Sequence, residues 1–263
     1  MSHCVIIPSY NSGSLLEPTL RAVLSSGTPV ILVVDGSNDG SDKCADVIQV
    51  ETDTLTVLRL PANHGKGEAV LRGFRAATAR GFTHALVFDA DGQHASEDVL
   101  KILSLSRSHP EAMILGVPLF GPEAPALRVN GRKLGNWWTN VETLWGGIED
   151  SLFGFRVYPI QASIQVLESI RGGRRFDFET QLAVRLYWQG VPAIGFPSPV
   201  IYLKKGVGGV SHFHYVRDNL LLVWTHALLC LQALAMLPRL IRLRKYNQRY
   251  RSGGIQERCA TSM

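Results

Sequence analysis

The sequence has few cysteines, and they lack the spacing of a metal site. Its four cysteines lie at positions 4, 44, 230 and 259, far from the short paired spacing that zinc sites use. This argues against a zinc-binding fold, and we interpret all four as free thiols in a reducing compartment. The first residues, MSHCVIIPSYNSG, also lack a basic start followed by a long apolar run, so we expect no signal peptide.

Two glycine-rich nucleotide motifs are missing as well. No G-x-G-x-x-G follows the apolar run at 4–8, which argues against a dehydrogenase that binds a dinucleotide cofactor. The run HGKGE at 64–68 is not a P-loop, which requires G-x-x-x-x-G-K-[ST]. The chain has no internal repeat and no low-complexity segment, and its 263 residues suit one large domain or two small ones.

The net charge of +5 is concentrated in one C-terminal segment. Residues 239–251 contain no acidic residue and six basic ones, which are Arg239, Arg242, Arg244, Lys245, Arg249 and Arg251. Subtracting these six from +5 leaves about −1 for the other residues. The main body is therefore nearly neutral, and we expect no nucleic-acid partner.

Short apolar runs alternate with helix-like stretches along the chain. The predicted strands are residues 4–8, 30–34, 55–60, 84–88, 112–116 and 200–203. The predicted helices include 14–25, 66–80, 96–108, 127–145, 159–169, 178–189 and 216–237. Strands and helices that alternate with short connections predict an α/β fold, with a mainly parallel sheet covered by helices on both faces.

The domain prediction follows composition. Residues 1–214 form the predicted catalytic domain, with halves at 1–117 and 118–214 that meet in a Pro/Gly-rich loop. Residues 215–251 form an apolar helix and a basic tail. We expect residues 252–263 to be disordered.

The stretch FDADGQH places two carboxylates directly after a buried strand. Residues i and i+2 of a strand point to the same side, so Asp89 and Asp91 share one side. They lie at the carboxyl end of a strand, where open α/β sheets bind ligands. Carboxylates held this close favour a cation between them, and Mg²⁺ or Mn²⁺ would accept them, with Gln93 lending a carbonyl oxygen. The alternative is an acidic turn that caps the next helix.

Three other strand ends carry polar loops that would converge on the same edge. Pro8, Tyr10 and Asn11 follow the first strand. Asp35 ends the second strand and opens a turn-rich loop, VVDGSNDGS. The third strand leads into NHGKGEAVLRG. Four neighbouring polar loops favour a ligand site over an isolated acidic turn.

The ordered set IPSYN, VVDGSNDGS, NHGKGEAVLRGF and FDADGQH resembles the family 2 glycosyltransferases of the GT-A fold. DSLFGFRVYP and RFDFETQLAVRLYWQGV resemble the dolichol-phosphate-mannose-synthase-like branch, and the resemblance covers roughly residues 3–215. It implies a nucleotide-sugar donor, a divalent metal on the D-x-D motif and inversion at the anomeric carbon.

The resemblance also implies roles for single residues. Those expected to bind the nucleotide sugar are Pro8, Tyr10, Asn11, Asp35, Ser37, Lys66 and Asp89. Asp89 and Asp91 would hold the metal and the diphosphate, and Gln93 would assist the metal. Where the family has VDDGS, this chain has VVDGS, so one aspartate is missing and the choice between UDP and GDP stays open.

The second half would position the acceptor. In this branch the pair Asp150 and Arg156 lines the active site, and Arg132 would face phosphate. A phosphate acceptor is already a nucleophile, whereas a hydroxyl acceptor needs a base. The base would be Asp150 or, failing it, Asp177 or Glu179; for these two the alternative is an acidic helix N-terminus.

The loop GGVSHFH resembles a loop that closes over the donor diphosphate. Related enzymes often carry lysine after the serine, where this chain has His212. We expect His212 to bind phosphate or metal, with a structural role as the alternative.

Residues 219–238 contain no charged side chain and approach the ~20 residues that span a bilayer. Asp218, Thr225, Gln232 and Arg239 are spaced seven apart, which predicts one polar stripe. If this helix spanned the membrane, the basic tail would prefer the cytoplasmic side and leave the catalytic domain away from nucleotide sugars. We therefore predict a helix that lies on the inner membrane surface; packing on the domain or in a homo-oligomer is the alternative.

The leading hypothesis is an inverting, metal-dependent glycosyltransferase on the cytoplasmic face of the inner membrane, peripheral or monotopic. Its acceptor would be a lipid or lipid-linked molecule, with polyprenyl phosphate first and a lipid or small-molecule hydroxyl second. An alternative of another class is a module that binds nucleotide sugar without turnover, which only the shortened VVDGS loop favours.

Overall fold

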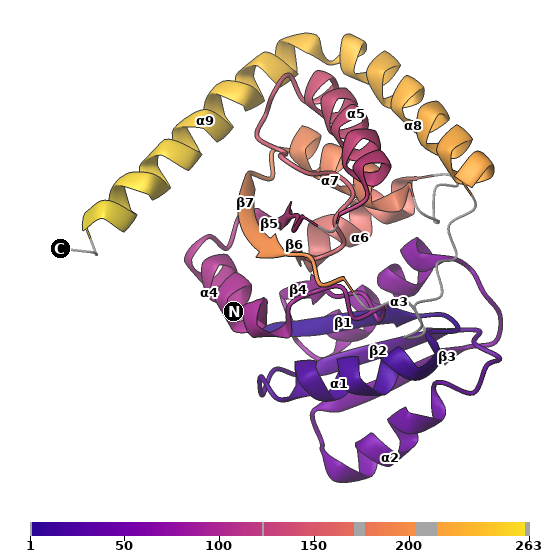
Figure 1. Cartoon of the computed structure of the whole chain (residues 1–263). Coiled ribbons are helices and arrows are strands. Elements are labelled where there is room, and N and C mark those ends of the chain that lie inside the picture. The colour runs from indigo at the N-terminus through magenta and orange to yellow at the C-terminus, as the bar shows by residue number, and fades with distance from the viewer. Residues whose placement is uncertain (1, 123, 171–176, 203–214, 261–263) are drawn as a thin grey trace.

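The computed structural model describes residues 2–122, 124–170, 177–202 and 215–260, around a central seven-stranded sheet (Figure 1). The strand order is β3-β2-β1-β4-β6-β5-β7, and all neighbours are parallel except the two pairs that include β6. The strands are β1 (His3–Ser9), β2 (Val30–Asp35), β3 (Leu55–Leu60), β4 (His84–Val87), β5 (Met113–Leu119), β6 (Arg156–Pro159) and β7 (Ala193–Pro199). The predicted mainly parallel α/β sheet is confirmed.

Two strands differ from the prediction. β6 was not predicted, and it inserts antiparallel between β4 and β5 because Val157 pairs with both Leu86 and Ile114. The strand predicted at 200–203 is wrong for residues 200–202, where Val200 makes only an isolated bridge to His94 and the regular pairing is made by β7 further upstream; residue 203 lies outside the described residues. β7 was missed in the sequence because it contains two prolines, Pro197 and Pro199, which are rare inside strands. They are tolerated there because β7 is an edge strand that needs N–H donors on one side only.

Helices cover both faces of this sheet. The helices are α1 (Leu16–Leu24), α2 (Lys43–Glu51), α3 (Lys66–Ala79), α4 (Val99–Ser108), α5 (Ala126–Glu142), α6 (Ile160–Ser169), α7 (Phe178–Gln189), α8 (Tyr215–Ala235) and α9 (Leu237–Ala260), with short 3-10 turns at Gly13–Leu15 and Ser96–Asp98. One buried cluster joins the sheet to α1, α2 and α4, and the other joins it to α3, α6 and α7. The sheet is thus held between two apolar layers, which fixes its carboxyl edge as a rigid platform.

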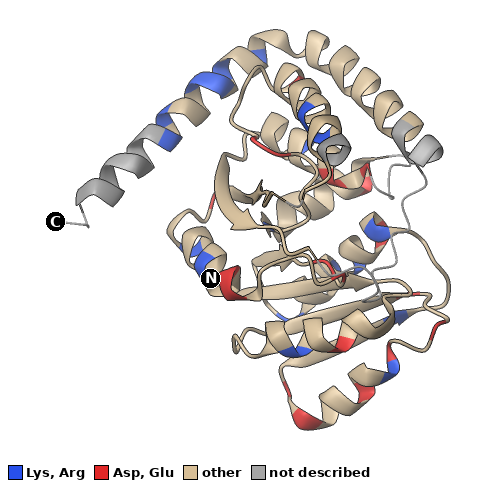
Figure 2. Cartoon of the chain, viewed as in Figure 1, with Lys and Arg blue, Asp and Glu red and all other residues tan. Residues whose placement is uncertain are grey.

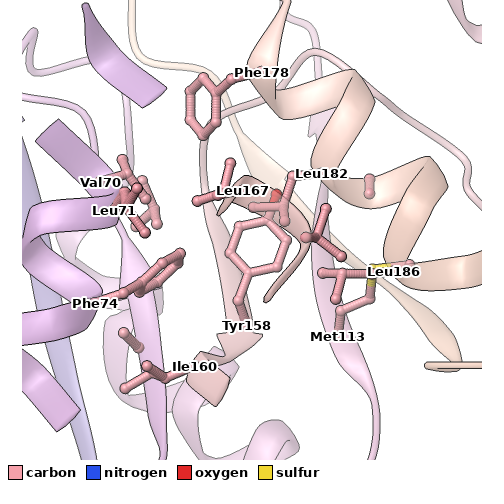
Figure 3. Close-up of a cluster of buried hydrophobic side chains, with 14 of the residues drawn as sticks. Val70, Leu71, Phe74, Met113, Tyr158, Ile160, Leu167, Phe178, Leu182 and Leu186 are labelled. Carbon is pink, nitrogen blue, oxygen red and sulfur yellow. The ribbon is translucent and has the colours of Figure 1, made fainter. Parts of the chain in front are cut away.

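The α3 side of the core is built from large apolar side chains (Figure 3). Phe74 of α3 is fully buried and meets the ring of Tyr158 edge-on, with ring centroids 6.2 Å apart. Leu182 and Leu186 of α7 approach the same ring from the other side (Figure 3). α3 and α7, whose first turns carry site residues, are therefore fixed to each other through one core.

α8 and α9 form a bent arm over the second half of the chain (Figure 1). α8 packs on α5, and α9 contacts α7. The arm is anchored near its end, where Asn247 accepts a hydrogen bond from the backbone N–H of Ala193 and donates one to the carbonyl of Gly146. By length and composition, no single described helix could cross a membrane, whereas 220–235 and 237–251 together pass that test as a pair bent by 94°. The chain stays helical past residue 251 and ends α9 at Ala260, in the segment that we expected to be disordered.

The predicted polar stripe on α8 does not form a single face. Thr225 is buried and donates to Asp177 (3.2 Å), whereas Gln232 and Arg239 are exposed. Beside Thr225, His226 pairs with the buried Glu142 of α5 at 2.7 Å. The buried face of α8 is therefore mixed: Thr225 and His226 meet carboxylates of the surface below, beside the buried apolar side chains of Leu229 and Ala233.

Acid is expected to destabilise the fold through a buried histidine pair. His3 stacks on His84 with ring centroids 4.9 Å apart, and burial followed by the charge of His84 lowers the pKa of His3 from 6.5 to about 4. Between pH 6.5 and 4, His3 is protonated in the unfolded chain but stays neutral in the folded chain. The free energy of unfolding therefore decreases as the pH falls through this range. The loss attributable to His3 is at most about 3 kcal/mol.

Urea unfolding of wild type and His3→Gln at pH 7.5 and pH 4.5 measures this loss. We expect the wild type to lose more stability between the two pH values than the variant does. An equal loss in both proteins would contradict this assignment.

Candidate active site

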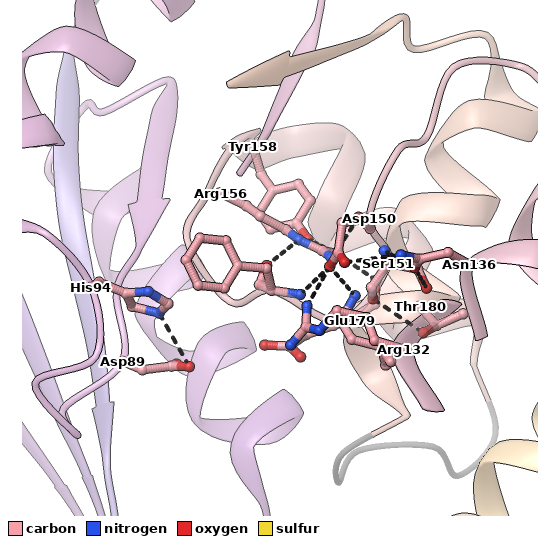
Figure 4. Close-up of polar contacts among 12 residues, drawn as sticks. Asp89, His94, Arg132, Asn136, Asp150, Ser151, Arg156, Tyr158, Glu179 and Thr180 are labelled. Carbon is pink, nitrogen blue, oxygen red and sulfur yellow. Dashed lines mark hydrogen bonds and ion pairs between the residues drawn. The ribbon is translucent and has the colours of Figure 1, made fainter. Parts of the chain in front are cut away.

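The D-x-D motif lies directly after β4, at the carboxyl edge of the sheet. Phe88 anchors the motif in the core against Phe155, with ring centroids 5.7 Å apart. Asp89 points into the site, where its carboxylate lies 2.5 Å from Lys66 Nζ and 3.4 Å from His94 Nε2; the contact with His94 is drawn in Figure 4. Burial would raise the pKa of Asp89, but the charge of Lys66 and the contacts of His94 outweigh it and hold that pKa below its usual value.

Lys66 joins the two halves of the chain. It is the first residue of α3, and its ammonium lies 2.6 Å from Glu179 Oε1 in the first turn of α7. Burial alone would lower the pKa of Lys66, but Asp89 and Glu179 together hold it above its usual value. The lysine is therefore a fixed positive charge between two carboxylates that lie 90 residues apart in the sequence.

A glycine makes room for this arrangement. A Cβ atom on Gly154 would lie 2.5 Å from Asp89 Oδ2 and 3.0 Å from Glu179 Oε1. No side chain fits at that distance without moving a carboxylate. We call Lys66, Asp89, Gly154 and Glu179 the acid–lysine cradle.

The donor set around the D-x-D motif fits a hard divalent cation. Burial, and then the negative charge of Asp89, raise the pKa of Asp91, a repulsion that a cation would relieve. Asp91 Oδ1 also accepts the backbone N–H of Gln93 at 3.0 Å, which holds the turn in shape. Within the described ranges, no group of three or more His, Cys, Asp or Glu side chains could hold a metal. A metal here would thus need oxygens from its ligand and water in addition to Asp89 and Asp91.

The loops after β1 and β2 are tied to each other. The backbone N–H of Asn11 donates to Ser37 Oγ at 3.0 Å, and Asn11 Oδ1 accepts the backbone N–H of Asn38 at 2.9 Å. Asn11 has a positive φ of 46°, which asparagine tolerates better than most residues. Pro8 lies in β1 and Tyr10 follows that strand, so both are at this edge as predicted.

Asp35 holds the loop that follows β3. Its carboxylate is buried and accepts the backbone N–H groups of His64 (2.9 Å) and Gly65 (2.8 Å). Gly36 makes this possible, because it has a φ of +67° and a Cβ there would lie 2.4 Å from the backbone of Ala62. Asp35, predicted to contact the donor, thus also holds the chain that leads to Lys66.

Asp150 accepts four hydrogen bonds from the side chains and backbone around it (Figure 4). Its Oδ1 accepts from Arg132 Nη1 (2.6 Å) and from the backbone N–H groups of Leu152 and Phe153. Its Oδ2 accepts from Asn136 at 3.0 Å. The carboxylate therefore orients Arg132, whose guanidinium lies over the rings of Phe120 and Phe153 and whose Nε and Nη2 make no hydrogen bond to the described residues.

Arg156 is fully buried and does not line an open surface (Figure 4). Its guanidinium donates to the carbonyls of Phe153, Asp150 and Glu179 and to the hydroxyl of Tyr158. Arg156 thus ties the Asp150–Phe153 turn to Glu179 of the cradle. Its geometry is that of a positioning residue.

Of the remaining predicted residues, one belongs to the cradle, one lies away from it and one is not described. Asp177 is buried under α8 and accepts from Gln181 (2.7 Å) and Thr225, away from the cradle. Glu179, two residues later, belongs to the cradle. His212 lies outside the described residues.

Sequence reasoning missed Gly154 and Asn136. Neither has a local signal: Gly154 lies in an irregular segment before β6, and Asn136 lies inside α5, where it also accepts from Ser151. Only the contact between chain segments far apart in sequence reveals their roles.

Known proteins resemble this chain in sequence and in fold. A sequence model described as glycosyl transferase family 2 matches residues 4–152, more than half of the chain. The chain is 29% identical over 185 residues to the undecaprenyl-phosphate mannosyltransferase of Micrococcus luteus, covering 69% of this chain and 68% of that protein. It is 27% identical over 214 residues to the polyprenol monophosphomannose synthase of Mycolicibacterium smegmatis, covering 79% and 80%.

Among solved structures, the chain resembles a mannosyltransferase from Pyrobaculum calidifontis in complex with GDP-Man and Mn²⁺. The TM-score is 0.58 at 16% sequence identity, over 92% of this chain and 73% of that one. At this identity the likeness concerns the fold.

Proposed function

The chain belongs to glycosyl transferase family 2, in its dolichol-phosphate-mannose-synthase-like branch and with the GT-A fold, and we propose that it moves one sugar from a nucleotide sugar to a polyprenyl phosphate. The observation that carries this proposal is the acid–lysine cradle, which places a fixed cation beside the D-x-D motif. A donor diphosphate needs positive charge at this point, because it gains negative charge as it leaves.

The hydrogen bonds of the Asp150 carboxylate favour a phosphate acceptor over a hydroxyl acceptor. Asp150 is buried, and its hydrogen bonds make it a support for Arg132 and for the backbone of Leu152 and Phe153, whereas a phosphate oxygen needs no base. Arg132 keeps two donor positions for an anionic acceptor. Two relatives are named for transfer to undecaprenyl phosphate or for making a polyprenol phosphomannose, which supports the same acceptor class.

In the proposed reaction, a phosphate oxygen of the acceptor attacks the anomeric carbon. The new C–O bond forms as the bond from that carbon to the diphosphate breaks, and the nucleoside diphosphate leaves with the electron pair. A single displacement of this kind inverts the anomeric centre. Lys66 supplies charge to the donor phosphates, while Arg132 orients the acceptor.

Asp89 and Asp91, assisted by Gln93, would hold Mg²⁺ or Mn²⁺. Such a metal, when bound, neutralises charge on the leaving diphosphate. A structural neighbour was solved with GDP-Man and Mn²⁺, which supports this part of the proposal.

Labelled UDP- and GDP-sugars, offered with Mn²⁺ and a bacterial membrane-lipid extract, test the function. We expect label in the lipid fraction from one of the two donor classes, and its loss on addition of a chelator. Binding of donor without any transfer would favour the non-catalytic binding module instead.

The outer face of α8 supports placement on a membrane surface. Five large apolar side chains point away from the body and are between 63% and 68% exposed, namely Leu220, Val223, Trp224, Leu231 and Leu234. Basic residues gather on α9, the helix that follows α8 after the bend (Figure 2). Apolar side chains beside a basic helix fit an anionic lipid surface, and nucleotide sugars place that surface on the cytoplasmic side of the membrane.

Replacing Leu231 and Leu234 by glutamine is expected to weaken binding to phosphatidylglycerol vesicles about tenfold or more, because both lose apolar burial in lipid. Val50→Gln is the matched control, since Val50 is 90% exposed on α2. Vesicle sedimentation measures the effect. Unchanged vesicle binding, together with a change from dimer to monomer, would assign this face to a homo-oligomer.

A further inference from the structure

A second cationic pocket lies under the bend between α8 and α9, formed by none of the residues of the active site. It has a volume of about 160 Å³, far more than the ~15 Å³ that one water needs. Its lining residues are Val166, Ser169, Arg185, Trp188, Gln189, Met236 and Arg239. They come from α6, α7 and the bend, so the pocket exists only when the arm is docked.

The pocket contains two arginines without a carboxylate partner among the described residues. Arg185 Nε is buried and makes no hydrogen bond, and its guanidinium lies 5.8 Å from the ring centroid of Trp188. Burial lowers the pKa of Arg185, which is the direction expected for a cation that has lost water without gaining an anion. Buried polar atoms of native proteins nearly always have hydrogen-bond partners, so Nε is a donor that a ligand in this pocket can use.

The other groups in the pocket favour an anion. Trp188 Nε1 already donates to the carbonyl of Glu142, and the Ser169 hydroxyl already donates to the carbonyl of Val166. No carboxylate lines the described walls. Arg185 and Arg239 therefore provide the free donors, and guanidinium groups are suited to bidentate contact with phosphate.

From this geometry we infer that Arg185 and Arg239 form a binding site for a phosphate group, distinct from the donor site. Two sources share this chemistry: the headgroup of an anionic phospholipid and a soluble phosphate. Arg239 is exposed at the bend, so a phosphate group of either source could reach it from outside. A bound phosphate would fasten the bend to α7 and hold the arm in place.

The first arm of the test measures thermal unfolding of the full chain in rising inorganic phosphate, with chloride at matched ionic strength. At saturating phosphate we expect the Tm of the wild type to rise by about 3 °C more than in chloride. Arg185→Gln and Arg239→Gln should each abolish this excess. Arg242→Gln, which removes the same charge from an exposed position on α9 outside the pocket, should keep it.

The second arm identifies the source by vesicle sedimentation. If the ligand is a headgroup, Arg239→Gln should weaken binding to phosphatidylglycerol vesicles at least fivefold, and Arg242→Gln less than twofold. If only the response to soluble phosphate depends on the two arginines, the site serves a soluble phosphate. Equal behaviour of all variants in both arms, or equal losses in Arg242→Gln, would overturn the inference.

Arg239 is exposed, so its variant keeps the test valid if Arg185→Gln fails to fold. Neither arm requires sugar transfer. Failure of this site and failure of the proposed enzyme activity are therefore separate results.

Discussion

Asp91→Asn is expected to lower sugar transfer at least 100-fold while leaving the metal-free protein as stable as the wild type or slightly more so. The carboxylate is needed to hold a cation on the leaving diphosphate, and lost electrostatic stabilisation of this kind costs about 10²–10³ in rate. Stability should not fall, because the substitution removes the repulsion between Asp91 and Asp89 that raises the pKa of Asp91.

Asp53→Asn is the matched control, since Asp53 is exposed on the turn between α2 and β3. Transfer assays and thermal unfolding of the three proteins measure both halves of the prediction. An activity of Asp91→Asn within threefold of wild type would contradict the metal role, and a large loss of stability would make Asp91 a structural residue.

Gly154→Ala is expected to reduce transfer about 100-fold through a single methyl group. Its Cβ would lie 2.5 Å from Asp89 Oδ2, so the Asp89 carboxylate must move away from Lys66. Displacing a catalytic group by about 1 Å costs on the order of 100-fold in rate. Transfer assays should show the loss at every donor concentration, because saturating donor cannot restore the position of Asp89.

Gly131→Ala is the control for this variant. Gly131 lies in α5, where an added methyl group would have nothing within 4 Å, and alanine is the better helix former. The control should therefore keep full activity and unfold no earlier than the wild type. Wild-type activity in Gly154→Ala would show that the cradle is not the catalytic centre.

Local patterns predicted the parts of the site that follow strand ends. Asp89, Asp91 and Asn11 lie where the sequence placed them, because the carboxyl ends of parallel strands share one edge. Helix α7 begins at the predicted residue, which set Glu179 in its first turn. These predictions needed only the periodicity of single segments.

What the sequence left hidden depends on contacts between distant segments. Lys66 and Glu179 are 113 residues apart, and no spacing rule pairs them. The same holds for the role of Asp150, whose carboxylate is taken up by Arg132 and Asn136 from a neighbouring helix. Hydrogen-bond partners of this kind, from distant segments, determine whether a carboxylate acts as a base or holds neighbouring residues in place.

The orientation of α8 shows the same limit. Its composition suggested an apolar helix with one polar stripe, but the buried carboxylates of Glu142 and Asp177 attract His226 and Thr225 inward. The helix therefore docks by a mixed face, in which these two polar side chains lie beside the apolar Leu229 and Ala233. Because Glu142 and Asp177 lie far from α8 in sequence, periodicity alone could not predict which face would be exposed.

The most direct measurement offers purified protein its labelled donor with two defined acceptors, a short polyprenyl phosphate and the matching polyprenol. We predict transfer to the phosphate alone, with one nucleoside diphosphate released for each sugar transferred. Transfer to the polyprenol at an equal or higher rate would contradict the account, and would make a hydroxyl the acceptor and Asp150 its base.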